Sequence, residues 1–165
     1  MSDTPLSPTA AVEKLHPYVP GKPISELERE YGITSSIKMA SNENPLGPGP
    51  HALVAIAASA AELGLYPDGN GFELKCALAA KHGCAIDAIT LGNGSNDVLV
   101  MIAETFLDHR TEAVYSQYGF AVYPIAVQAC GAIARVAPAL SEASAMPFGH
   151  DLDAMAALVD RKSVV

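Results

Sequence analysis

The second half of the chain alternates short apolar runs with helical segments. From residue 87 on, each run of three to five β-forming residues is followed by turn residues and then by a segment with helical periodicity. In chain order we expect strand Ile89–Leu91, helix Val98–Leu107, strand Ala113–Tyr115, helix Phe120–Ala129, strand Ala132–Val136 and helix Asp151–Val159, whose start His150 or Asp151 would cap. Strands separated by helices pair as a parallel sheet covered on both faces. The pattern predicts an α/β fold. Ser163–Val165 begins another β run, so we expect the sheet to continue beyond the chain.

The first half is punctuated by prolines. Five of them fall before residue 24, so we expect residues 1–38 to form an extended arm in which only Ser25–Tyr31 is helical. Residues 39–165 would form the α/β domain. Further expected elements are a strand at Ile37–Ala40, a nearly all-apolar and hence buried helix at His51–Leu63, and an amphipathic surface helix at Phe72–His82 that ends at Gly83.

Charge and composition exclude several classes of protein. The 165 residues carry a net charge of −8, which argues against a nucleic-acid partner, and 50% of them are apolar, enough for a globular core. The longest apolar stretches are far shorter than the roughly 20 residues that cross a bilayer, so no membrane partner is expected. The first twenty residues resemble neither a secretory signal nor a mitochondrial presequence, so we expect a cytoplasmic protein. The three cysteines form no CxxC pair, and the five histidines show no metal-ligand spacing.

A glycine-rich turn precedes the helix expected at 98–107. In Gly92-Asn93-Gly94-Ser95-Asn96, the glycines permit a tight turn and the following N–H groups point outward from a helix start, which is a typical anion site. The alternative is that a strand-to-helix turn simply needs glycine. The run is not a dinucleotide fingerprint, because its sixth position is Asp97, and no P-loop lysine follows.

Two tyrosines lie where a ligand could reach them. Tyr118 follows the strand that ends near Tyr115, at the sheet edge where open α/β folds bind ligands, and could stack on a planar cofactor. Tyr66 lies in a turn and could donate its hydroxyl proton to a phosphate. Each could equally cover a sheet end or a loop with its hydroxyl in water.

Taken together, five ordered sequence blocks resemble the histidinol-phosphate aminotransferase family, over nearly the whole chain. The blocks are Tyr18–Pro23, Lys38–Pro48, Tyr66–Gly71, Gly92–Asn96 and Tyr118-Gly119. The resemblance implies the large domain of a fold-type-I enzyme that uses pyridoxal 5'-phosphate, incomplete in this chain. It also implies a homodimer with active sites at the subunit interface.

The resemblance assigns roles to particular residues. It implies that Gly94, Ser95 and Asn96 bind the cofactor phosphate and that the ring of Tyr118 stacks on the pyridine. Tyr66 would donate to the phosphate in the neighbouring subunit's site. Tyr18 and Asn44 would face the amino-acid substrate.

The resemblance also implies an activity and a missing part. The intact enzyme would transfer an amino group between histidinol phosphate, an amino-acid phosphate, and 2-oxoglutarate, a 2-oxo acid. None of the lysines matches the family's Schiff-base lysine, which we expect beyond the chain end together with the aspartate for the pyridine nitrogen and the arginine for the substrate carboxylate. We therefore expect no catalytic residue here and an inactive, truncated form. The alternatives are a non-catalytic remnant that binds a partner, or a sibling activity such as aromatic amino-acid transamination or amino-acid phosphate decarboxylation.

Overall fold

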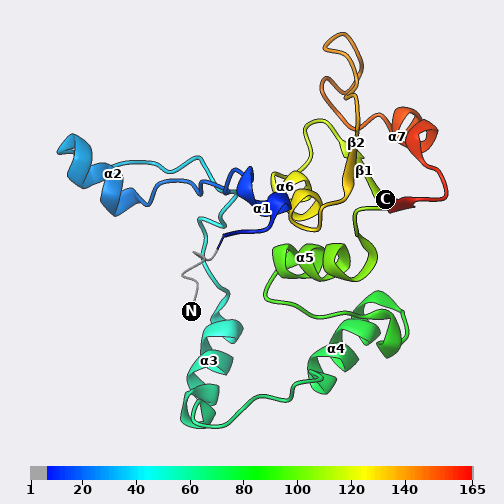
Figure 1. Ribbon diagram of the computed structural model, residues 1–165. Helices are drawn as coiled ribbons and strands as arrows, with labels where there is room; N and C mark the ends of the chain where they lie inside the picture. The colour runs from blue at the N-terminus through cyan, green and yellow to red at the C-terminus, as the bar shows by residue number, and fades with distance from the viewer. Residues whose placement is uncertain (1–6, 165) are drawn as a thin grey trace, which may run out of the picture. The chain divides into compact units, whose positions relative to one another are not determined.

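The computed structural model describes residues 7–164 (Figure 1). Its contacts divide the chain into two units. Unit 1 joins residues 7–18 to residues 90–164, and unit 2 is the segment 19–89 between them. The first six residues of the predicted arm and Val165 of the last predicted β run lie outside the described residues. The division of the chain at residues 38 and 39 stays a prediction.

Unit 2 contains helices, and none of its residues 19–89, all of which the structure describes, is in a strand. Its elements are α2 (Ile24–Tyr31), α3 (Pro50–Ser59), the 3-10 turn η1 (Ala60–Glu62), α4 (Phe72–His82) and the 3-10 turn η2 (Ile86–Ala88). The three helices predicted in this region are confirmed. Pro50 stands in the first turn of α3, where its missing N–H is no loss. Gly83 ends α4 with φ of 65°, a left-handed conformation that glycine adopts without steric cost.

Two strand predictions and one burial prediction are wrong. Ile37–Ala40 and Ile89–Leu91 are not strands, because no neighbouring strand pairs with their backbone groups within the described residues. The helix predicted at 51–63 forms but is not buried, since Leu53, Val54 and Ile56 in α3 are 53, 70 and 65% exposed. Local propensity and caps are enough to form a helix, whereas burial needs a covering surface, which residues 19–89 do not provide for α3.

Unit 1 holds the sheet. Its elements are α1 (Ala10–Glu13), α5 (Ser95–Phe106), β1 (Glu112–Ser116), α6 (Val122–Ala129), β2 (Ile133–Ala137), α7 (Leu152–Leu158) and β3 (Ser163–Val164). The strands lie in the order β2-β1-β3, and both pairs are parallel, which confirms the predicted α/β fold. Figure 1 shows α6 and α7 on opposite sides of β1 and β2. The one-turn helix α1 was not predicted. It forms because the Thr9 carbonyl accepts hydrogen bonds from the N–H groups of Val12 and Glu13.

A small core lies between the helices and the central strand. Ala103 of α5 packs with Val122 and Ala126 of α6, and β1 is buried along most of its length. The Asp151 side chain accepts a 2.9 Å hydrogen bond from the N–H of Ala154 and caps α7, as the sequence predicts. The helix predicted from Val98 begins earlier, at Ser95, because Gly94 takes the N-cap position.

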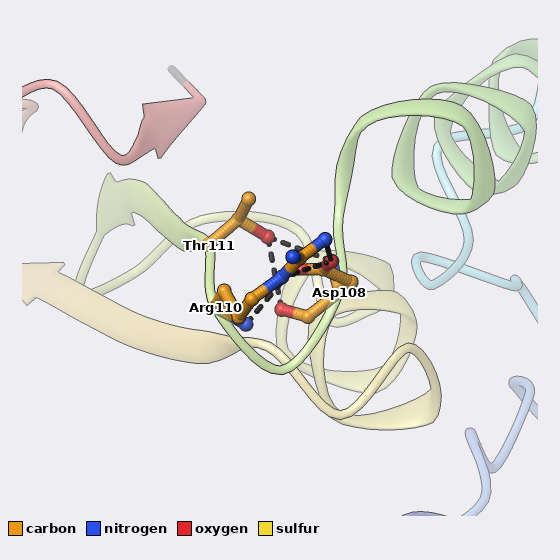
Figure 2. Close-up of polar contacts among 3 residues, drawn as sticks. All are labelled: Asp108, Arg110 and Thr111. Atoms are coloured by element: carbon orange, nitrogen blue, oxygen red, sulfur yellow. Dashed lines mark hydrogen bonds and ion pairs between the residues drawn. The ribbon is translucent and has the colours of Figure 1, made fainter.

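Polar contacts fix the amino end of β1. In the turn after α5 (Figure 2), the Arg110 guanidinium donates to the Asp108 carboxylate at 2.7 and 3.0 Å, and the N–H of Asp108 donates to the Thr111 hydroxyl at 2.7 Å. On the neighbouring strand, Arg135 donates two hydrogen bonds to the buried Glu112, the shorter at 2.6 Å. These contacts lie at the end of the sheet opposite to the carboxyl edge.

Candidate functional site

The carboxyl end of β1 borders a cavity of about 440 Å³. Because the strands are parallel, the segment after β1 and the loop of residues 138–151 after β2 meet at the same edge of the sheet. The cavity is lined mainly by aromatic and aliphatic side chains, with few polar groups. Its lining includes Ser116, Tyr118, Phe120, Tyr123, His150 and Met155.

Ser116 lines this cavity, and its hydroxyl is buried. The residue is 5% exposed, and its Oγ has no hydrogen-bond partner among the described residues. Leaving such a group unpaired costs about 1–3 kcal/mol. A water or a polar ligand atom within hydrogen-bond distance of the Ser116 hydroxyl would supply the missing partner.

Tyr118 lines this cavity and belongs to a group of aromatic side chains. Its ring stands edge-on to that of Phe148, with centroids 5.8 Å apart and an interplanar angle of 89°. Tyr18 makes a similar contact with Phe120 at 6.2 Å, so two of the predicted site residues are near this sheet edge. On β1, the Tyr115 ring stacks on Tyr123, and burial raises the pKa of its phenol.

The predicted glycine turn leads directly into α5. Gly94 has φ of 86° and ψ of 173°, which glycine alone adopts readily. A Cβ on Gly92 would come within 2.9 Å of a Val98 methyl group, so the backbone at both positions favours glycine over any larger residue. The Asp97 carboxylate is turned back and accepts a 2.9 Å hydrogen bond from the N–H of Asn93.

The residues at the start of α5 are accessible. Gly94, Ser95 and Asn96 are exposed, and the first N–H groups of a helix have no partner within it. The partial positive charge of the helix start adds to their attraction for an anion. The cavity that Tyr118 lines does not include these three residues. The structure thus places both features in unit 1 without joining them in one cavity.

Asn44 and Tyr66 lie in unit 2. The amide of Asn44 closes a local turn, since its Nδ2 donates to the Gly47 carbonyl at 3.0 Å and its Oδ1 accepts from the N–H of Leu46 at 3.1 Å. It also lines a separate cavity of about 420 Å³ beside Lys38. The Tyr66 side chain is fully exposed. Their predicted roles stay predictions.

Two residues of this edge were not found by sequence reasoning. Ser116 directly follows the strand predicted to end at Tyr115, so its position at the carboxyl edge could have been found. For Phe148, the flanking Pro147 and Gly149 signal a turn, but no local pattern indicates a ring contact with Tyr118. Within residues 7–164 no cluster of three or more potential metal ligands occurs, and no helix there is long and apolar enough to cross a membrane.

The chain is similar to curated aminotransferases over nearly its whole length. It is 53% identical to histidinol-phosphate aminotransferase 2 of Pseudomonas aeruginosa, with 100% of this chain and 44% of that protein covered. It is 52% identical to histidinol-phosphate aminotransferase 2 of Methylococcus capsulatus, with 97% and 43% covered. No family model matches the sequence.

A solved structure also resembles this chain. The crystal structure of histidinol-phosphate aminotransferase from Sinorhizobium meliloti in complex with pyridoxal-5'-phosphate matches it with a TM-score of 0.78 and 26% identity, covering 98% of this chain and 41% of that one. The fold of an Escherichia coli aminotransferase matches with a TM-score of 0.69. This chain spans less than half the length of the relatives it matches, and over that length it belongs to the histidinol-phosphate aminotransferase family.

Proposed function

We propose that this chain is the part of a histidinol-phosphate aminotransferase that binds the phosphate and one ring face of pyridoxal 5'-phosphate. The complete enzyme would transfer an amino group from histidinol phosphate to 2-oxoglutarate. The observation that carries the proposal is the 53% identity to a histidinol-phosphate aminotransferase over the whole of this chain.

The exposed start of α5 fits the phosphate of this cofactor. Gly94 is the N-cap of α5, and the exposed backbone N–H groups of Ser95 and Asn96 have no acceptor within the helix. Ser95 and Asn96 also carry polar side chains that can bind phosphate oxygens.

The cavity at the end of β1 fits a flat heterocycle with polar substituents. Tyr118 offers an aromatic face for the pyridine ring, and the Ser116 hydroxyl offers a buried polar group that lacks a partner. When bound, the cofactor supplies a pyridine ring that accepts electrons from the bonds broken at the amino-acid carbon.

None of the lysines among the described residues lines the cavity that contains Tyr118. In unit 1, Lys14 follows α1 and Lys162 precedes β3, and neither lines the cavity of Tyr118. We therefore propose that the chain by itself contributes binding groups and does not transaminate.

We further propose a cytoplasmic homodimer in which Tyr66 reaches the partner's phosphate and Tyr18 and Asn44 face the substrate. The complete exposure of Tyr66 and the exposed apolar side chains of α3 support a protein partner for unit 2. The same α3 side chains favour the second candidate, a non-catalytic fragment that binds a partner. The two candidates differ in phosphate binding, because only the first requires Gly94–Asn96 to bind an anion.

The test is a titration of the chain with pyridoxal 5'-phosphate and, separately, with inorganic phosphate, followed by amide NMR. We expect both to shift the amide signals of Gly94, Ser95 and Asn96. Ser95→Ala removes one hydroxyl donor, so binding should weaken about three- to tenfold, the value of one hydrogen bond.

Ser25→Ala is the matched control, because Ser25 lies in the first turn of an exposed helix, α2, outside the proposed site. It should leave the affinity unchanged. Equal shifts at both helix starts, or none at Gly94–Asn96, would contradict the proposal and favour the interaction fragment.

A further inference from the structure

Phe148 has an unusual backbone conformation. Its φ is 59°, in the left-handed region that a residue with a bulky side chain rarely adopts. Such a conformation persists only where the surrounding structure imposes it, and it is frequent at functional sites. Phe148 is 51% exposed, so burial in a core does not explain why phenylalanine stands here.

The loop around Phe148 is held by backbone hydrogen bonds. The N–H of Phe148 donates to the Leu140 carbonyl at 3.2 Å, and the N–H of Leu140 donates to the Gly149 carbonyl at 2.9 Å. Ala139 and His150 form an antiparallel bridge at the base of the loop. These contacts restrain the backbone on both sides of Phe148 and stabilise its left-handed conformation.

The same loop is tied to the segment that carries Tyr118. The side-chain oxygen of Gln117 accepts a 3.2 Å hydrogen bond from the N–H of Ala139. The backbone N–H of Gln117 donates to the Ala137 carbonyl at 2.9 Å. Gln117 precedes Tyr118, so the two ring-bearing segments are anchored to each other at their bases.

The strained turn brings the Phe148 ring against Tyr118. The rings lie 5.8 Å apart at 89°, the edge-to-face geometry that aromatic pairs prefer. Tyr118 is itself 58% exposed, so few other contacts restrict its ring. In an edge-to-face pair at least one face of the Tyr118 ring stays free.

Phe148 does not line the cavity, whereas Tyr118 does. We propose that Phe148 is a positioning residue: it fixes the plane of the Tyr118 ring so that one face is presented to a planar heterocyclic ligand in the cavity. This inference rests on the proposed function, in which that ligand is the pyridine ring of the cofactor.

The experiment compares three variants of the chain by NMR of the Tyr118 ring protons. Phe148→Leu keeps an apolar side chain of similar size but removes the ring, and the ring-current shift of Tyr118 should disappear. Phe148→Tyr keeps the ring and should retain the shift. Phe106→Leu is the matched control, because Phe106 is a 60% exposed phenylalanine at the end of α5, and it should change nothing at Tyr118.

The second measurement is the affinity for pyridoxal, which lacks the phosphate, and for inorganic phosphate. Phe148→Leu should weaken pyridoxal binding about fivefold, the value of one aromatic pair, and leave phosphate binding unchanged. Phe148→Tyr should bind pyridoxal as tightly as the unmodified chain.

The two proposals fail in different ways. If Phe148→Leu leaves the Tyr118 ring signals unchanged while the β1 amide signals show an intact fold, Phe148 does not position the ring and the inference is wrong. An equal loss of phosphate binding in this variant also overturns it, because the effect would then be a general loss of structure. If neither pyridoxal nor phosphate binds the unmodified chain, the proposed function fails, while the ring signals still decide whether Phe148 orients Tyr118.

Discussion

The two units of this chain form helices equally well but bury their side chains very differently. In unit 1 the facing sides of α5 and α6 and most of β1 are buried. In unit 2, where the structure describes every residue from 19 to 89, none is buried. The apolar helix α3 is the clearest case, since Val54 is 70% exposed although Val127 in α6 is 5% exposed.

This difference separates two causes of helix formation. The helices of unit 2 begin and end at local signals, such as Pro50 in the first turn of α3 and Gly83 after α4. The helices of unit 1 also pack on a sheet, whose strands come from distant parts of the sequence. Local signals determine where a helix lies, and packing determines how much that helix contributes to stability.

The largest expected effect comes from one substitution made in both units. Val127→Ala should lower the free energy of unfolding by about 2 kcal/mol, because it removes two buried carbon atoms and leaves a cavity. Val54→Ala should change it by less than about 0.5 kcal/mol, because that side chain is already in water. Urea unfolding followed by circular dichroism measures both. Equal losses would mean that α3 is covered in solution, and the contrast between the units would disappear.

An ion pair from each unit gives a smaller contrast. Arg135→Ala leaves the buried Glu112 carboxylate without the side chain that donates its two hydrogen bonds, so we expect a loss of unfolding free energy that is measurable but smaller than for Val127→Ala. Lys22, whose ammonium pairs with Glu30 on α2, is exposed like its partner, and Lys22→Ala should leave the free energy of unfolding nearly unchanged.

Salt distinguishes the two pairs further. In 1 M sodium chloride the Lys22 effect should vanish, because exposed charges are screened, whereas most of the Arg135 effect should remain. The measurement is the change in unfolding free energy for each variant at low and high salt. An Arg135 effect that disappears in salt would show that Glu112 is solvated and that the sheet does not depend on this pair.

Sequence reasoning succeeded where the signal is local. β1, β2 and α7 lie within one or two residues of their predicted positions, and Asp151 caps α7 as predicted, because hydrophobic periodicity and cap residues act over a few positions. The glycine turn before α5 was found for the same reason, since Gly94 needs its left-handed φ whatever surrounds it.

Sequence reasoning failed where the outcome depends on a distant surface. The apolar pattern of α3 indicated burial, and the run at Ile37–Ala40 indicated a strand, but neither pattern reveals whether a partner is present. The orphan hydroxyl of Ser116 and the contact between Phe148 and Tyr118 arise from loops that meet at a sheet edge. No short sequence motif predicts that these loops come into contact.

The smallest expected effect concerns two exposed carboxylates with lowered pKa values. In unit 2, backbone N–H groups of Phe72 and Asn70 donate to Asp68 and lower its pKa below the ordinary 3.8. In unit 1, the Arg110 guanidinium and then the Arg110 N–H lower the pKa of Asp108 in the same direction. A lowered folded-state pKa means that each carboxylate stabilises the fold above pH 3.8 and that this contribution is lost as the pH falls through the folded-state pKa.

The two shifts have different causes, and a single variant separates them. Arg110→Gln keeps the backbone N–H but removes the charge, so the pKa of Asp108 should rise toward 3.8 while that of Asp68 stays low. Carboxyl-carbon NMR over an acid titration measures both groups in one sample. Added salt should move Asp108 in the same direction and leave Asp68 nearly unchanged, because hydrogen bonds from neutral amides are screened little. If Asp108 does not respond to Arg110→Gln, its shift comes from the turn backbone alone, and the two units then stabilise their exposed carboxylates in the same way.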